Sequence, residues 1–283
     1  MGFIYDMKTS AVRLASVFTK GTCAQRAQRA DEFNSLLFSR MYELYKGTDS
    51  VELGAVKKTF KDFLPESLPF GVREYPQDDR CKAALSIYFE NGKPYYCEMG
   101  LGLKDDKLEV ETLSELMHES AHLWDFLLNP KILRTQEKLQ EKGLLDSVEE
   151  HFIEGYYKRR TSDNKKKEIK KIKKSTNKFL SSLSPEDRLL ALNNIRYSLM
   201  MESHAFREGK KCAKTLRNNG RQYLKRDAVH SDYDFLFNEK IELVNDMTSE
   251  LIEKERYKNA QRIAKTPEEK IANFIDYHFR NKI

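Results

Sequence analysis

Two histidines spaced four residues apart, with a glutamate beside the first, are the residues of this chain best suited to catalysis. They form the run His118-Glu119-Ser120-Ala121-His122. On a helix, residues i and i+4 lie on one face, so both imidazoles can reach one metal ion. Zinc lowers the pKa of a bound water to about 7, and Glu119 is placed to accept the proton of that water. The run predicts a hydrolytic zinc site, and the alternative is two histidines satisfied by hydrogen bonds on a half-buried helix.

The elements that must position this motif are a helix and a preceding strand pair. Residues 112–128 carry apolar side chains at helical spacing, and Asn129-Pro130 ends the pattern. Upstream, residues 84–89 and 95–103 are rich in β-forming side chains, and Asn91-Gly92 between them is typical of a tight hairpin turn. We therefore expect a β-hairpin followed directly by the helix that carries the two histidines.

The segment from Thr112 to His122 resembles the active-site helix of the zincin metallopeptidases. The resemblance covers about fifty residues, from the hairpin through Pro130. It implies an α+β, predominantly helical zincin-like fold with a small β-sheet packed beside the active-site helix, a Zn2+ cofactor, and substrate binding along the edge strand of the sheet. The metzincin branch does not fit, since it needs Gly at position 125 and His or Asp at 128, where this chain has Asp125 and Leu128.

A catalytic zinc takes three protein ligands and leaves the fourth position to water. Glu202 is our candidate for the third ligand. It falls between Leu199 and Phe206 on an apolar helical stripe, where a carboxylate is costly unless it is paired or binds a metal. The arrangement resembles the gluzincins, in which a Glu on a second helix completes the site and a small residue, here Ala205, allows close helix packing. The interval of 80 residues after His122 is long, and a basic tract within it accounts for much of the excess.

Other residues compete with Glu202 for this role. A salt bridge from Glu202 to Arg196 or Arg207 is the structural alternative. His204 is a rival ligand, but it is turned about 200° from Glu202 around the helix, so only one of the two can face the metal. A second rival cluster lies upstream: Glu149, Glu150, His151 and Glu154.

Residues outside the coordination sphere complete the predicted site. Asp125 follows His122 by about one turn and could orient its imidazole, although a surface Asp is as good an interpretation. A zincin usually adds a donor that stabilises the oxyanion. Our candidates for this donor are His204, His230, Tyr233, Tyr197 and Tyr223. Trp124, the single tryptophan, is expected in the core rather than against substrate.

Helical patterns cover most of the remaining chain. We expect helices over 24–48, over 131–157 with a break near Gly143, over 185–217 with Ser184 as N-cap, and over 232–282. We interpret residues 1–283 as a single zincin-like catalytic domain. Its parts are a helical N-terminal part (1–50), the hairpin and active helix (84–130), a basic insert that we expect to be mobile (158–178), and a helical C-terminal part (184–283).

Charge in this chain is concentrated in one segment. The 283 residues carry a formal net charge of +6, but residues 158–178 alone hold eleven Lys or Arg and two acids, which leaves a mildly acidic remainder. The tract lacks the interleaved aromatic residues of a base-stacking surface, so nucleic acid is not the expected partner. A solvated loop or a frayed helix is the default interpretation, and an acidic partner, an acidic membrane surface or a sorting signal are the alternatives.

Composition sets further limits. No run of 18 or more apolar residues exists, so no transmembrane segment is expected. The four cysteines make no zinc-ribbon spacing and indicate free thiols, with a Cys81–Cys97 bridge as the alternative. We expect a cytoplasmic protein without a signal peptide, exported into a host cell by a signal-independent secretion system if it acts as an effector.

The functional hypothesis is a zinc-dependent metalloendopeptidase that cuts a cytosolic protein or peptide substrate, as a secreted bacterial effector protease does. His118, His122 and Glu202 bind zinc, and Glu119 acts as general base and then as proton donor to the leaving amine. The alternative is a zincin-like binding module that engages an acidic partner or surface through its basic tract. The presence of Glu119 in the motif favours the enzyme, because a scaffold needs no general base at that position. Hydrolysis of a non-peptide amide is a third interpretation, which the sequence does not separate from peptidolysis.

Overall fold

The computed structural model describes residues 23–64, 68–74, 83–91, 93–157, 165–219 and 227–279. The chain divides into two compact units. The first unit comprises Met1–Lys142 and Met200–Phe237, and the second comprises Gly143–Leu199 and Asn238–Ile283. The described residues are mainly helical with small sheets, which confirms the predominantly helical α+β class. That the chain acts as a single catalytic domain stays a prediction.

The sheet of the first unit contains the predicted hairpin. Its strands are β2 (Phe70–Glu74), β3 (Ala83–Glu90) and β4 (Lys93–Leu101), in the order β2-β4-β3. Strand β3 runs antiparallel to β4, with Leu85 opposite Met99, and β2 runs parallel to β4. Asn91 follows β3 with a φ of 53°, a left-handed conformation that Asn tolerates. Strand β3 is therefore an edge of this sheet.

A second, smaller strand pair completes the β-structure described in this unit. Strand β1 (Ser50–Glu52) pairs antiparallel with β5 (Lys107–Glu109). A short 3-10 turn, η1 (Val110–Thr112), leads from β5 directly into helix α4 (Leu113–Leu128). The hairpin thus precedes the helix with the two histidines, as predicted, but it is not followed by it directly, because β5 and η1 lie between β4 and α4.

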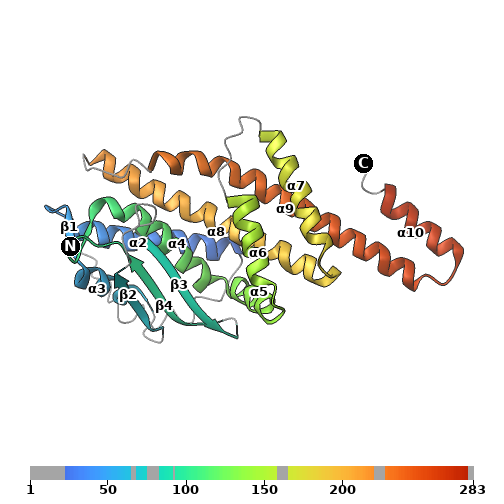
Figure 1. Ribbon diagram of the computed structural model, residues 1–283, viewed down its shortest axis with the longest axis horizontal. Coiled ribbons are helices and arrows are strands. Elements are labelled where there is room, and N and C mark those ends of the chain that lie inside the picture. Colours follow the sequence, from blue (N-terminus) through green and yellow to red (C-terminus); the bar gives the residue numbers. More distant parts are fainter. Residues whose placement is uncertain are drawn as a thin grey trace. The chain divides into compact units, whose positions relative to one another are not determined.

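Helices of the first unit pack beside the sheet and against one another. They are α2 (Cys23–Leu44), α3 (Leu53–Phe63), α4, α5 (Pro130–Glu141) and the later part of α8 (Pro185–Asn218). Helix α4 packs against β3 on one side and α2 on another (Figure 1). Trp124 is fully buried in the resulting core and its ring lies 5.2 Å from that of Phe33, as expected for a core tryptophan. The motif helix is thus held between the edge strand and a second helix.

The second unit is built from helices in its described part. They are α6 (Leu145–Phe152), the π-helix η2 (Ile153–Tyr157), α7 (Lys165–Ser181), the first part of α8, most of α9 (Asp227–Ile263) and α10 (Pro267–Phe279). Gly143, with a φ of 66°, separates α5 from α6 at the predicted break. The start of α8 is also as predicted, because the Ser184 hydroxyl accepts the Asp187 N–H at 3.2 Å.

The basic tract, predicted to be a solvated loop or a frayed helix, is helical where the structure describes it. Residues 158–164 lie outside the described residues, and residues 165–178 belong to the regular helix α7. This helix buries a stripe at four-residue spacing, namely Glu168, Ile172, Thr176 and Leu180. Two of these four residues are polar, so the spacing of apolar residues alone did not predict this helix.

Two further expectations concern membrane spans and thiols. Among the described helices, none combines the length and the apolar character that crossing a bilayer requires. Cys97 and Cys212 are buried free thiols. Cys81, the expected alternative partner of Cys97, lies outside the described residues.

Candidate metal centre

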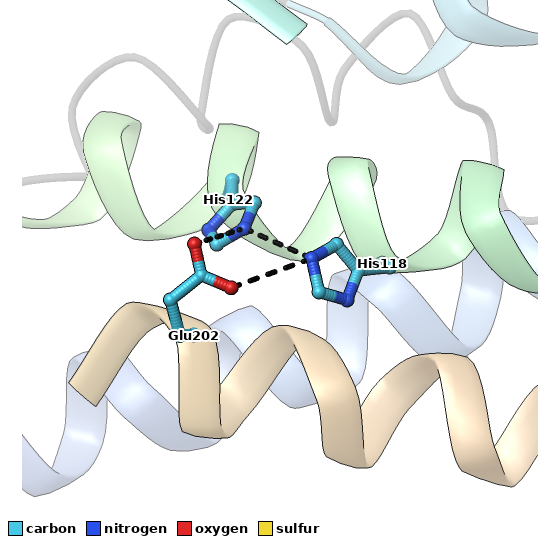
Figure 2. Close-up of side chains that lie close together, drawn as sticks. All are labelled: His118, His122 and Glu202. Atoms are coloured by element: carbon cyan, nitrogen blue, oxygen red, sulfur yellow. Dashed lines mark hydrogen bonds and ion pairs between the residues drawn. The ribbon is translucent and has the colours of Figure 1, made fainter. Parts of the chain in front are cut away.

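Two histidines and one glutamate converge from two helices of the first unit. His118 and His122 project from successive turns of α4, and Glu202 points at both of them from α8 (Figure 2). The two Nε2 atoms are 3.2 Å apart. Oε2 of Glu202 lies 3.6 Å from Nε2 of His118, and Oε1 lies 3.6 Å from Nε2 of His122. The structure therefore brings together the three residues that the sequence singled out as ligands.

The spacing of these atoms fits a zinc ion. Ligand atoms about 2.0–2.2 Å from a tetrahedral zinc lie about 3.3–3.6 Å from one another, close to the three distances observed here. Oε2 of Glu202 has no hydrogen-bond donor among the described residues, although it is buried. A buried carboxylate oxygen without a donor is costly, and a metal ion would satisfy it. Three ligands also leave a fourth position open, as catalytic zinc sites require.

Burial shifts the pKa values of the candidate ligands in opposite directions. Burial, and after it the nearby charge of His204, lower the pKa of His122 to about 3, so its imidazole is neutral at neutral pH. Neutral imidazole is the form that binds metals. Burial also raises the pKa of Glu202 to about 8. The ion-pair contacts that the structure records for Glu202 are to these two histidines, and Arg207 instead contacts Asp31 and Glu208.

Glu119 is held beside the group but faces the sheet. Its Oε2 accepts the backbone N–H of Leu85, on edge strand β3, at 3.2 Å. Burial, and then the charge of Glu202, raise the pKa of Glu119 to about 8, against a smaller lowering by the Leu85 N–H. The effect of Glu202 on this pKa indicates that the two carboxyl groups are close. Glu119 is thus a proton-carrying group next to the candidate metal position without belonging to the ligand set.

Asp125 and His204 are paired with each other. Nδ1 of His204 lies 2.8 Å from Oδ2 of Asp125, and both side chains are buried. Asp125 therefore contacts His204 rather than a ligand imidazole, and Nδ1 of His122 has no hydrogen-bond partner among the described residues. On the other side of His204, Asp31 and Glu208 form a second group of metal-ligating residue types with it. These two carboxylates already form ion pairs with Arg207 and Lys211, so basic side chains balance their charge without a metal ion.

None of the remaining candidates has a described side chain in the first unit. Tyr197 and the rival cluster of Glu149, Glu150, His151 and Glu154 belong to the second unit. His230 and Tyr233 lie on α9, but their side chains are outside those described, and Tyr223 is outside the described residues altogether. A role for any of them as oxyanion donor stays a prediction.

Two contacts of the site were not anticipated from the sequence. The ring of Phe206 meets that of His118 edge to face, with centroids 4.7 Å apart. Phe206 had been placed on the apolar stripe of α8, but no pattern indicated its partner. The second contact is the hydrogen bond from the Leu85 backbone N–H to Glu119. It does not depend on the side chain at position 85, so only the closeness of the hairpin to the motif in the sequence could have suggested it.

Comparisons with known proteins add no relative. No family model matches the chain, and neither the curated proteins nor the solved structures yield a match. The geometry of the site therefore carries the functional argument by itself.

Proposed function

We propose that this protein is a zinc-dependent metallopeptidase with a zincin-like arrangement of its first unit. The observation that carries the proposal is the convergence of His118, His122 and Glu202 at ligand distances, with Glu119 beside them. Each of these four residues has the chemical type that the reaction needs. The carboxylate of Glu202 comes from a different helix, α8, than the two histidines on α4.

The residues divide the chemistry between them. His118, His122 and Glu202 would hold the ion. Zinc in such a site acts as a Lewis acid and lowers the pKa of a coordinated water to about 7. Glu119 takes a proton from the attacking water and returns it to the leaving amine. The Leu85 N–H keeps the Glu119 carboxylate in place while its proton comes and goes.

Edge strand β3 is where we place the substrate. It runs along α4, and its Leu85 N–H points away from β4, toward Glu119. A peptide that lies along this edge would bring a carbonyl past Glu119, in keeping with the zincin resemblance. We propose a protein or peptide substrate on this ground. Location in the cytoplasm and delivery into a host cell as an effector stay predictions of the sequence.

Metal content and cleavage test the proposal together. Purified wild-type protein should contain about one zinc per chain by elemental mass spectrometry, since the site has one set of ligands. Glu202→Ala should lose most of that zinc. Glu119→Gln should keep it and abolish cleavage of peptide libraries read by mass spectrometry. Wild-type protein without zinc after reconstitution at neutral pH overturns the proposal, and Glu119→Gln that cuts at the wild-type rate overturns the mechanism.

A second candidate function is a binding module, and helix α7 favours it. Exposed lysines follow its outer face, whereas its acidic residue Glu168 is buried. The exposed lysines are Lys166, Lys167, Lys170, Lys171, Lys174 and Lys178. Anionic vesicles should then bind the wild type, and Lys170→Glu with Lys174→Glu should weaken that binding. Vesicle binding in a protein that holds no zinc and cuts no peptide would favour the module over the enzyme.

A further inference from the structure

A buried network ties three helices together behind the candidate metal centre. His204 on α8 contacts Asp125 on α4 through Nδ1 at 2.8 Å, and its Nε2 lies 3.0 Å from Oδ1 of Asp31 on α2. The contact to Asp125 is an aligned hydrogen bond, whereas Nε2 has none among the described residues and meets Asp31 only as an ion pair. His204 thus has one strong link, to the helix that carries the two candidate histidine ligands.

A second link lies farther along the same helices. Glu208 on α8 is almost fully buried and accepts a hydrogen bond from Nδ2 of Asn34 on α2 at 3.3 Å. The same Nδ2 lies 3.4 Å from the carbonyl oxygen of Met117, the residue before His118. Asn34 thus links α2 to both other helices, and on α4 it does so at the residue before His118.

The ring of His204 lies between two acidic residues on neighbouring helices. A carboxylate faces each ring nitrogen, and Arg207 on the same helix also contacts Asp31. The imidazole is consequently a rigid, buried bridge between helices rather than a free ligand for a second ion.

We infer that His204 is a positioning residue for the zinc site, acting through Asp125. This inference rests on the proposed function. Asp125 follows His122 by three residues on α4, and His204 follows Glu202 by two on α8. The Asp125–His204 bond therefore fixes how far α8 is shifted along α4, at less than one turn from the ligands. A shift of α8 moves the Glu202 carboxylate away from the two Nε2 atoms and weakens zinc binding, although His204 never touches the ion.

Two conservative variants distinguish the contact of His204 with Asp125 from its contact with Asp31. In His204→Asn the amide nitrogen falls near the position of Nδ1 and can still donate to Asp125. In His204→Gln it falls near the position of Nε2, on the Asp31 side. We expect His204→Asn to keep zinc affinity within about threefold of wild type, and His204→Gln and His204→Ala to lower it about 10–100-fold, as loss of a residue supporting the ligands does.

The measurement is zinc affinity by competition with a chromogenic chelator. Urea unfolding of the metal-free proteins runs alongside and shows that each variant is folded before its affinity is compared. A merely structural role predicts lowered urea midpoints for Asn and Gln alike, with unchanged zinc affinity, and that result overturns the inference. In a double-mutant cycle, Asp125→Ala combined with His204→Ala should weaken zinc binding no further than either change alone. Additive losses would contradict action through Asp125.

The experiment also separates this inference from the proposed function. Glu202→Ala, two residues away, removes a candidate ligand and should lose zinc even if the His204 variants bind zinc as wild type does. A wild-type protein that binds no zinc overturns both ideas. Zinc bound equally by wild type and all three His204 variants overturns the positioning role alone and leaves the metallopeptidase standing.

Discussion

The backbone N–H of Leu85 donates to Oε2 of Glu119 across 3.2 Å. This bond joins edge strand β3 to helix α4 at the residue next to His118, so the candidate general base is held by the surface on which we place the substrate. One N–H does not offset the free-energy cost of burying the charged carboxylate, and the pKa of Glu119 therefore stays raised to about 8. A protein that keeps a carboxylate in such a place gives up stability for it, which is typical of functional sites.

Replacing Glu119 should therefore stabilise the metal-free protein. The pKa of Glu119 is higher in the folded state than its ordinary value of about 4.5. The contribution of this group to stability is therefore full below about pH 4.5 and is lost as pH rises toward about 8. Glu119→Gln has no carboxyl group to ionise at this position, so its stability does not fall in this way as pH rises. We expect the variant to exceed wild type by on the order of 1 kcal/mol in unfolding free energy at pH 8.5, and by less at pH 5.

Urea unfolding in the presence of a chelator measures this difference at both pH values. Glu141→Gln, on the exposed last turn of α5, is the matched removal of a carboxylate and should stay within about 0.5 kcal/mol of wild type. A Glu119→Gln protein less stable than wild type at pH 8.5 contradicts the prediction.

Zinc should stabilise the folded chain in proportion to its binding. A ligand that binds only the native state adds about 2.7 kcal/mol at a concentration 100 times its Kd. We expect added zinc to raise the melting temperature of wild type and Glu119→Gln, and chelation to reverse the rise. His122→Ala and Glu202→Ala should show neither effect, because each lacks one of the converging ligands. Equal shifts in all four proteins would place the zinc elsewhere.

Trp124 is expected to be a major contributor to stability. It is fully buried on α4 and packs on Phe33, while its indole N–H has no partner among the described residues. Trp124→Ala should cost about 3–5 kcal/mol, as large-to-small changes in cores do. Trp124→Phe should cost much less, since it keeps an aromatic ring and removes the unsatisfied donor. Chemical denaturation followed by circular dichroism tests both, and equal losses would mean that the ring contacts contribute little.

The N-cap of α8 supports the helix that carries Glu202. The Ser184 hydroxyl accepts the Asp187 N–H and also contacts the Asp187 carboxylate. Ser184→Ala should lower the unfolding free energy by about 1 kcal/mol, the usual cost of losing such a cap. Ser182→Ala, which removes a nearby exposed hydroxyl bonded to the Phe179 carbonyl, serves as control. A loss no larger than that of the control would show that the cap is dispensable.

The sequence predicted the parts of the site that local patterns encode. Asn91 and Asn129-Pro130 marked the limits of hairpin and motif helix because turn and helix-end chemistry is local. Glu202 stood out because a carboxylate on an apolar stripe needs a partner. The Asp125–His204 pair was out of reach, since each residue by itself reads as an ordinary polar side chain and only the packing of two helices brings them together.

Long-range pairing and mixed stripes set the other limits. Strand β2 pairs parallel to β4, and a five-residue strand after a proline-punctuated stretch gives little signal of its own. Helix α7 buries Glu168 and Thr176 alongside Ile172, so apolar periodicity alone underestimates its packed face. In both cases the information lies in contacts between segments rather than in the order of residues within one.

The spacing of 80 positions from His122 to Glu202 has a consequence for biosynthesis. A growing chain on the ribosome displays both histidines long before α8 has been made, and so it holds two-thirds of the ligand set without the carboxylate that closes it. Helix α4 and its hairpin can form early, because they are neighbours in sequence. On the proposed function, zinc binding would be completed only after α8 has been made and has packed against α4. The proposed peptidase would then be inactive during its own synthesis.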